Sequence, residues 1–277
     1  MQNVGNRSFI FVVLAIYALV NMLSFVWVGA MSFKTSSEIM STSPWSPPEA
    51  VTWKNYVDAW TVGRIGGYML NSVFVTTVAT VAALAISSMS GYILGKFTFK
   101  GSGAVMAVFM VAMMIPPFMI VVPLFDVLQS LRLLNSHWGL ILVYIAMQVP
   151  LNTFILTAFH RTLPKQLEEA AAIDGASPLR TFWRIVLPLT TPALIACGIV
   201  NILHIWNEFL YALVFLQDRT MYTLPVGIFN LGQVADYSSN WGILFAGMFI
   251  SILPVLILFA VFQKQFTAGV AQGAMKL

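Results

Sequence analysis

Hydrophobic residues follow one another in six long runs along the chain, and more polar stretches separate these runs. An α-helix needs roughly 20 mostly apolar residues to cross about 30 Å of hydrocarbon, and each run provides about that many. We therefore predict an all-α polytopic membrane protein with six transmembrane helices. The spans lie at about residues 9–32, 70–95, 104–125, 137–159, 190–216 and 241–263.

The first run resembles the beginning of a signal peptide because it follows Arg7. A signal-peptide core, however, extends over only about 7–15 apolar residues. Residues 8–33 contain no charged side chain and are clearly longer than such a core. We interpret this run as a retained first span.

The composition agrees with a membrane protein. The chain is 59% hydrophobic and 9% charged, whereas soluble domains carry about 25% charged residues. Its net charge of +4 is spread thinly between the apolar runs, which fits membrane topology better than a nucleic-acid surface. The single cysteine, Cys197, cannot form a disulfide within the chain.

The distribution of Lys and Arg predicts the orientation of the spans. An even number of spans places both termini on one side of the membrane. The side that holds the termini carries Arg7, Lys96, Lys100, Arg161, Lys165, Arg180, Arg184, Lys264 and Lys276, and the other side carries Lys34, Lys54, Arg64, Arg132 and Arg219. Cytoplasmic loops are enriched in Lys and Arg, so we predict that both termini are cytoplasmic.

Proline, glycine and serine mark special places within and between the spans. The outer loop at 34–68 is rich in Pro and Trp, which predicts an irregular loop, and a second outer loop is predicted at 217–240.

Ser87, Gly91 and Gly95 have a spacing that favours close approach of a neighbouring helix. Proline tends to kink a helix, and we expect kinks at Pro116, Pro117, Pro123, Pro150 and Pro254.

Charge is concentrated in residues 160–189, which we call the EAA segment. Two short helices are predicted there, the first beginning at Pro164 and ending at Gly175. Ser177-Pro178 is typical of the start of the second, and Pro188 is expected to end it. The segment holds seven charged residues, which are Arg161, Lys165, Glu168, Glu169, Asp174, Arg180 and Arg184.

Two interpretations of the EAA segment follow from its residues. The second predicted helix carries an apolar stripe formed by Leu179, Phe182, Trp183 and Val186. An amphipathic elbow lying on lipid headgroups would explain this stripe and the arginines. It would not explain the acidic residues or the sharp turn, which favour a docking site for a cytoplasmic protein.

The sequence EAAAIDGASPLRTFWRIVLP is similar to the EAA---G---------I-LP loop of ABC-importer membrane subunits. All of the fixed positions match, namely Glu169, Ala170, Ala171, Gly175, Ile185, Leu187 and Pro188. Stretches such as GYILGKFTFKG, HIWNEFLYALVFL, YTLPVG and the closing AGVAQGAMKL further resemble carbohydrate permeases of the maltose-transporter G-subunit type. The resemblance covers nearly the whole chain.

This resemblance implies the type I ABC-importer transmembrane fold, with residues 1–277 as a single permease domain in a prokaryotic cytoplasmic (inner) membrane. It implies a sugar substrate and three kinds of partner: a second related permease, two ATPase subunits and an extracytoplasmic solute-binding protein. The EAA segment would dock in an ATPase subunit, with the tail at 264–277 close by. No phosphate-binding G-x-x-x-x-G-K-[ST] motif occurs, so we predict no enzymatic activity and no cofactor in this chain, with ATP and Mg bound by the partner ATPase.

Glu208 is the acidic residue that the pattern places inside a span. A charge at the bilayer centre costs about 2.5–3.5 kcal/mol on insertion scales, so it should face protein or a water-filled cavity. A polar stripe on one face of the fifth predicted helix accompanies it, and the candidate translocation-pathway residues are Asn201, His204, Asn207, Glu208 and Tyr211. The stripe is compatible with direct sugar contact, with an interhelical hydrogen-bond cluster and with contact to the partner permease. A zinc site at His204 and Glu208 lacks a third ligand.

Three functions other than sugar import by an ABC permease fit parts of the sequence. The cargo of an ABC importer could be another polar solute, although WNEFLYAL and YTLPVG argue for sugar. An ion-coupled secondary transporter would use Glu208 as its ion site, but such proteins often show inverted repeats and none is evident. A membrane scaffold that only recruits an ATPase would not need an aligned polar stripe.

Overall fold

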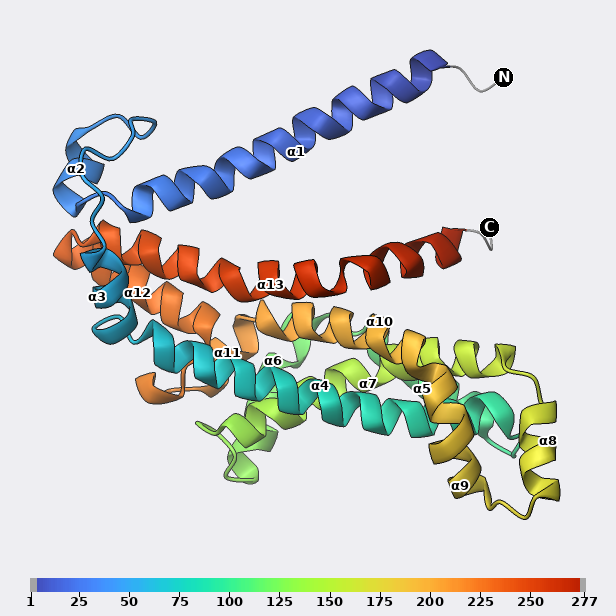
Figure 1. Ribbon diagram of the computed structural model, residues 1–277. Helices are drawn as coiled ribbons and strands as arrows, with labels where there is room; N and C mark the ends of the chain where they lie inside the picture. The colour runs from blue at the N-terminus through green and yellow to red at the C-terminus, as the bar shows by residue number, and fades with distance from the viewer. Residues whose placement is uncertain (1–3, 275–277) are drawn as a thin grey trace. The chain divides into compact units, whose positions relative to one another are not determined.

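The computed structural model describes residues 4–274, with the side chains of residues 9–237 and 239–263. Every regular element in the described range is a helix (Figure 1). Five helices are long and apolar enough to span a membrane, and one bent pair adds a further candidate. The prediction of an all-α, multi-span chain is confirmed, while the count of six spans stays a prediction.

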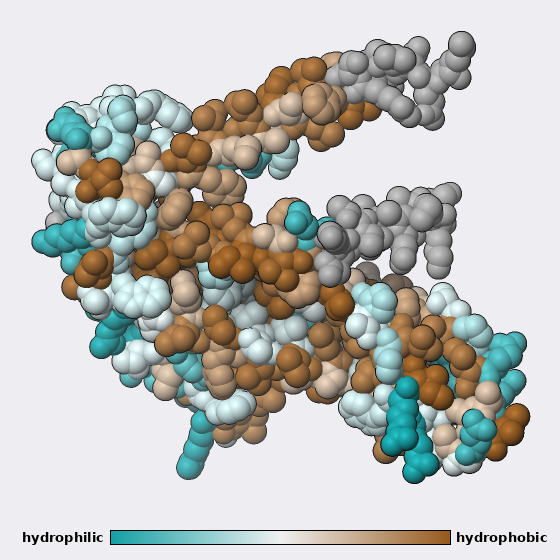
Figure 2. All heavy atoms as spheres, in the orientation of Figure 1, coloured by the Kyte–Doolittle hydropathy of each residue, from teal (hydrophilic) through white to brown (hydrophobic). Residues whose placement is uncertain are grey.

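The chain divides into two compact units. In the first unit, residues up to Met69 join Val226–Ile257. Helix α1 (Val4–Ser32) leaves its apolar side chains between Phe9 and Val26 exposed, and Figure 2 shows hydrophobic residues over most of its coloured surface. A helix with such a surface suits lipid or a protein partner.

The region at 34–68 is more regular than predicted. It contains α2 (Ser36–Ser41) and α3 (Lys54–Thr61). Lys34 is fully buried, and its Nζ donates to Ser43 O (3.3 Å) and Ser46 Oγ (2.9 Å) as well as to a threonine hydroxyl. These hydrogen bonds order a region that we predicted to be irregular from its proline content.

The last part of the first unit is formed by α12 (Leu224–Ser238) and α13 (Trp241–Ala274), the latter continuing beyond it. The predicted outer loop at 217–240 is therefore largely helical. Pro254 lies inside α13 without ending it. The side chains of the tail at 264–277 lie outside the described residues.

The second unit contains α4 (Ile65–Lys96) from Leu70 onward, followed by α5 (Ser102–Met114), α6 (Pro117–Ser130) and α7 (His137–Thr162). The predicted third span is broken. Ile115 and Pro116 are extended, and α5 and α6 meet at 105°. Two consecutive prolines remove two backbone donors and force the preceding residue out of the helical region, which produces a break where we expected a kink.

Helices α4 and α7 approach closely at the small residues that the sequence singled out. A Cβ on Gly91 would lie 2.9 Å from Leu156 Cβ, and one on Gly95 would lie 3.0 Å from the Thr157 carbonyl oxygen. Ser87 Oγ also donates to a carbonyl of α7. The predicted close contact is confirmed.

Replacing Gly91 with leucine should therefore separate α4 from α7. Because the nearest atoms belong to a backbone and to a Cβ, they cannot rotate away, and we expect a loss of roughly 1–3 kcal/mol of stability. The matched control is Gly67→Leu on the same helix, where nothing lies within 4 Å of the added Cβ. Thermal unfolding of the detergent-purified protein measures both variants, and equal melting temperatures would contradict the close contact.

Candidate functional site

The EAA segment folds into helix α8 (Gln166–Ile173), a turn, and a second helix that begins at α9 (Pro178–Thr181). The first helix starts two residues after the predicted Pro164. Ser177 accepts a hydrogen bond from the Arg180 amide, so the predicted cap of the second helix is confirmed.

Gly175 shapes the turn between the two helices. Its φ is +75°, a left-handed conformation that costs other residues more than glycine. The Ala176 amide donates to Ala171 O (2.9 Å) and the Gly175 amide to Ala172 O (3.0 Å), the two bonds of a Schellman motif. The predicted glycine C-terminus is confirmed.

The expectation that Pro188 ends the second helix is wrong. The helix continues through a π-helical turn (Phe182–Val186) into α10 (Leu187–Trp206). Pro188 cannot donate to the carbonyl four residues earlier. The chain accommodates this loss by widening one turn, in which the Leu187 amide donates to Phe182 O.

The apolar stripe of the second helix does not face one way. Phe182 and Val186 are buried and cluster with Tyr92 of α4. Leu179 and Trp183 are 63% and 50% exposed. Half of the stripe therefore anchors the EAA segment to the membrane helices, and the other half is largely exposed.

The residues at the fixed positions of the EAA pattern differ in exposure. Ala171 is buried, and Ile185 and Leu187 are half-buried. Glu169, Ala170, Gly175 and Pro188 are exposed. Together with Ile173, which is 87% exposed, Glu169, Ala170 and Gly175 form an accessible surface on α8 and the turn, whereas Pro188 lies in α10.

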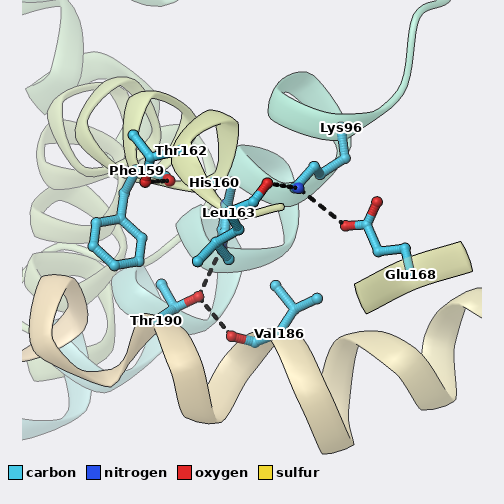
Figure 3. Close-up of polar contacts among 8 residues, drawn as sticks. All are labelled: Lys96, Phe159, His160, Thr162, Leu163, Glu168, Val186 and Thr190. Carbon is cyan, nitrogen blue, oxygen red and sulfur yellow. Dashed lines mark hydrogen bonds and ion pairs between the residues drawn. The ribbon is translucent and has the colours of Figure 1, made fainter. Parts of the chain in front are cut away.

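Polar contacts attach the EAA segment to the ends of three helices (Figure 3). Lys96, at the end of α4, donates to Leu163 O (2.7 Å) and lies 3.5 Å from Glu168 Oε1. His160 of α7 is fully buried, and its Nε2 lies 3.0 Å from Thr190 Oγ1 of α10. The segment is thus fixed to α4, α7 and α10 at one end of the second unit (Figure 1).

A row of paired side chains joins α7 to the antiparallel α10 and the residues after it. Tyr144 pairs with Glu208, Gln148 with His204, and His160 with Thr190, while Leu156 packs with Cys197. The spacing of these pairs brings Asn152 and Asn201 to the same level. Both are buried, and neither amide has a hydrogen-bond partner among the described residues.

The fifth predicted span is interrupted at Glu208. Helix α10 ends at Trp206 and α11 (Leu210–Phe215) begins after the break, so the expectation of one continuous helix is wrong. The Glu208 carboxylate accepts from the Tyr144 hydroxyl (2.5 Å) and from the amides of Tyr211 (2.8 Å) and Ala212 (3.2 Å). It satisfies the first amides of α11, which lack partners within their own helix.

The remaining members of the predicted polar stripe point in different directions. Asn201 is buried, whereas Asn207 is exposed and donates to Leu203 O. The Tyr211 hydroxyl donates to Pro117 O. His204 is exposed and, with Gln148, lines a cavity of about 350 Å³ beside the α5–α6 break. The structure therefore brings Glu208 and Tyr211 together and leaves His204 as the stripe residue that lines this cavity.

Sequence reasoning missed Lys96, His160, Tyr144 and Gln148 as parts of these networks. Lys96 directly follows the small-residue pattern that ends at Gly95, so the sequence could have predicted that its side chain lies close to α7. Tyr144 and Gln148 are four residues apart on α7 and therefore share one face of an otherwise apolar helix, which was a signal for both.

The second unit is thus an all-α, multi-span bundle from which a charged helix-turn-helix projects, the arrangement of a membrane-embedded transport component. The family described as "Binding-protein-dependent transport system inner membrane component" matches residues 87–272.

Curated relatives and a solved structure agree with that match. The chain is 36% identical to the diacetylchitobiose uptake system permease NgcG of Streptomyces coelicolor, over 95% of this chain and 87% of that protein. It is 35% identical to the arabinooligosaccharides transport system permease AraQ of Halalkalibacterium halodurans, over 95% and 92%. A crystal structure of a bacterial ABC transporter involved in alginate import shares the fold, with a TM-score of 0.81, 22% identity and coverage of 95% and 98%.

The chain belongs to the binding-protein-dependent transport system inner membrane component family. It is therefore a permease subunit of an ABC importer, and the predicted resemblance of the chain to ABC-importer permeases is confirmed.

Proposed function

We propose that this permease forms half of the pathway through which an ATP-driven importer moves a sugar or oligosaccharide. The observation that carries the proposal is the similarity along nearly the whole chain to permeases named for diacetylchitobiose and arabinooligosaccharide transport. In this proposal the substrate arrives on an extracytoplasmic solute-binding protein, and a second related permease completes the pathway in a bacterial inner membrane.

The EAA segment is the proposed contact with an ATPase subunit. Its exposed apolar side chains, Ile173, Leu179 and Trp183, lie beside the charged residues Glu169 and Arg180. This mixture of apolar contacts and both charge signs suits a protein surface. The proposal places the segment and both termini on the cytoplasmic side, in agreement with the Lys and Arg distribution.

The cavity at the α5–α6 break is the proposed pathway-facing part of this chain. Its lining is mostly apolar, with Gln148 and His204 as a hydrogen-bonded pair (2.8 Å). Such a pair offers a donor and an acceptor to a passing hydroxyl. Selection among sugars would then rest mainly with the solute-binding protein and the second permease.

Uptake into proteoliposomes tests the energy source. The complete transporter, with ATP enclosed on the ATPase side, is assayed for uptake of radiolabelled diacetylchitobiose and arabinotriose presented on the cognate binding protein. We expect uptake to depend on ATP and to continue when ionophores collapse all ion gradients, because hydrolysis supplies the free energy. Uptake that stops with the gradients at constant ATP would instead indicate ion coupling through Glu208.

A further inference from the structure

We infer that Lys96 is a positioning residue that makes the EAA segment and the end of α4 move as one body. The inference concerns how movement of α8 reaches the membrane helices, and it rests on the proposed docking of the EAA segment to an ATPase. It is carried by the contacts of Lys96, which belongs to no fixed position of the EAA pattern.

The Lys96 side chain is only 3% exposed although it carries a charge. Its Nζ donates to Leu163 O at 2.7 Å, the carbonyl of the residue that caps the C-terminus of α7. A cation is favourable there because the last carbonyls of a helix lack partners within the helix. One ammonium thus joins the C-terminal ends of α4 and α7.

The same ammonium lies 3.5 Å from Glu168 Oε1 in the first turn of α8. That oxygen is buried and has no hydrogen-bond partner among the described residues. The charge of Lys96 therefore offsets the desolvation of this carboxylate oxygen. The Glu168 side chain as a whole is 23% exposed, so Lys96 is the more deeply buried member of the pair. Removing Glu168 leaves the Lys96 charge buried without its partner, which is more costly than weakening an exposed ion pair.

The backbone of Lys96 is fixed independently of its side chain. The preceding Gly95 lies where an added Cβ would be 3.0 Å from both Thr157 O and His160 Cβ. The ammonium therefore extends from a close α4–α7 contact toward Glu168 on α8. A displacement of α8 must either carry α4 and α7 with it or separate a buried charge from its partner.

A second attachment exists, and it differs in chemistry. Tyr92 of α4 packs on Phe182 and Val186 of the π-helical turn. Apolar contacts of this kind are not directional and permit sliding, whereas Lys96 donates a directional hydrogen bond to Leu163 O and also forms an ion pair with Glu168. The inference assigns the rigid connection to Lys96 and a supporting role to the apolar cluster.

Spin-label distances test the inference without a transported sugar. Nitroxides are placed on α8 and α4 through Gln166→Cys, at the start of α8 and away from the turn, and Ile86→Cys, both at exposed positions, in a Cys197→Ser background. The complete transporter is measured without nucleotide and with ATP plus vanadate. With Lys96 present, we expect the same α8–α4 distance distribution in both states. With Lys96→Met, we expect the distribution to broaden or shift when ATP and vanadate are added.

Controls separate the pair from its surroundings. Lys100→Met, at an exposed position four residues later, should behave as the parent protein. Glu168→Gln should alter the distance distribution less in the Lys96→Met background than in the parent, because the effects of substitutions at interacting residues are not additive. The inference is overturned if Lys96→Met leaves both distributions unchanged, or if the parent distance itself changes with nucleotide. Failure of the proposed docking would show differently, as an ATPase that remains bound when the EAA turn is disrupted.

Discussion

Replacing Gly175 with valine is expected to abolish transport and release the ATPase subunit while the protein still inserts into the membrane. The φ of +75° at this position costs a β-branched residue of order 1–3 kcal/mol. The Schellman bonds formed by Gly175 and Ala176 would be lost as the backbone relaxes. The exposed side chains on either side of the turn would then no longer share one surface. Copurification of the ATPase with tagged permease measures the effect.

Two substitutions serve as controls for this experiment. Gly175→Asn should retain most ATPase binding, because asparagine tolerates the left-handed region better than valine. Gly103→Val adds the same side chain on α5 at a position where nothing lies within 4 Å and no positive φ is required. No atom lies within 4 Å of a Cβ on Gly175 either, so backbone conformation alone distinguishes the two glycines. Full ATPase recovery with Gly175→Val would show that the turn does not set the docking surface.

The sequence was most informative where local chemistry decides the structure. The left-handed turn at Gly175, the cap at Ser177 and the close approach at Gly91 all depend on a residue type that few others can replace. The apolar runs were equally informative, because a span must satisfy its backbone within itself. These features are confirmed in the structure.

The sequence was least informative where a local rule has several outcomes. Proline can end, kink or be accommodated by a helix. The adjacent Pro116 and Pro117 break a span at 105°, Pro188 is accommodated by a π-helical turn, and Pro254 lies within a continuing helix. Which outcome occurs depends on how the freed carbonyls are satisfied, and the residue type proline alone does not decide this.

The polar stripe of the fifth predicted span illustrates the same limit. Helical periodicity placed Asn201, His204 and Glu208 on one face, which was correct as far as Trp206. The break after that residue depends on Tyr144, 64 positions earlier, and on the amides of α11. Periodicity therefore identified polar residues that matter, but it could not assign them to a pathway or to an interhelical contact.

The stability of the break in the fifth span should depend on Glu208. Substitution by leucine removes three hydrogen bonds to a carboxylate, each worth about 1.5–3 kcal/mol when the acceptor is charged. It also leaves the Tyr144 hydroxyl and the amides of Tyr211 and Ala212 without their acceptor. Since some gain comes from no longer burying a charge, we expect a net loss of roughly 3 kcal/mol. Thermal unfolding in detergent measures this loss.

A graded series of variants distinguishes this capping role from substrate contact. Tyr144→Phe removes one of the three bonds and should cost about a third as much, and Glu208→Gln, whose amide oxygen can still accept, should lie between. Asn207→Ala is the matched control, because its exposed amide only donates to Leu203 O within the same helix. If Glu208 instead contacted sugar or carried an ion, Glu208→Leu would lose transport at an unchanged melting temperature. A fall in melting temperature that follows the number of lost bonds, with transport failing in parallel, identifies Glu208 as the residue that holds the broken span in place.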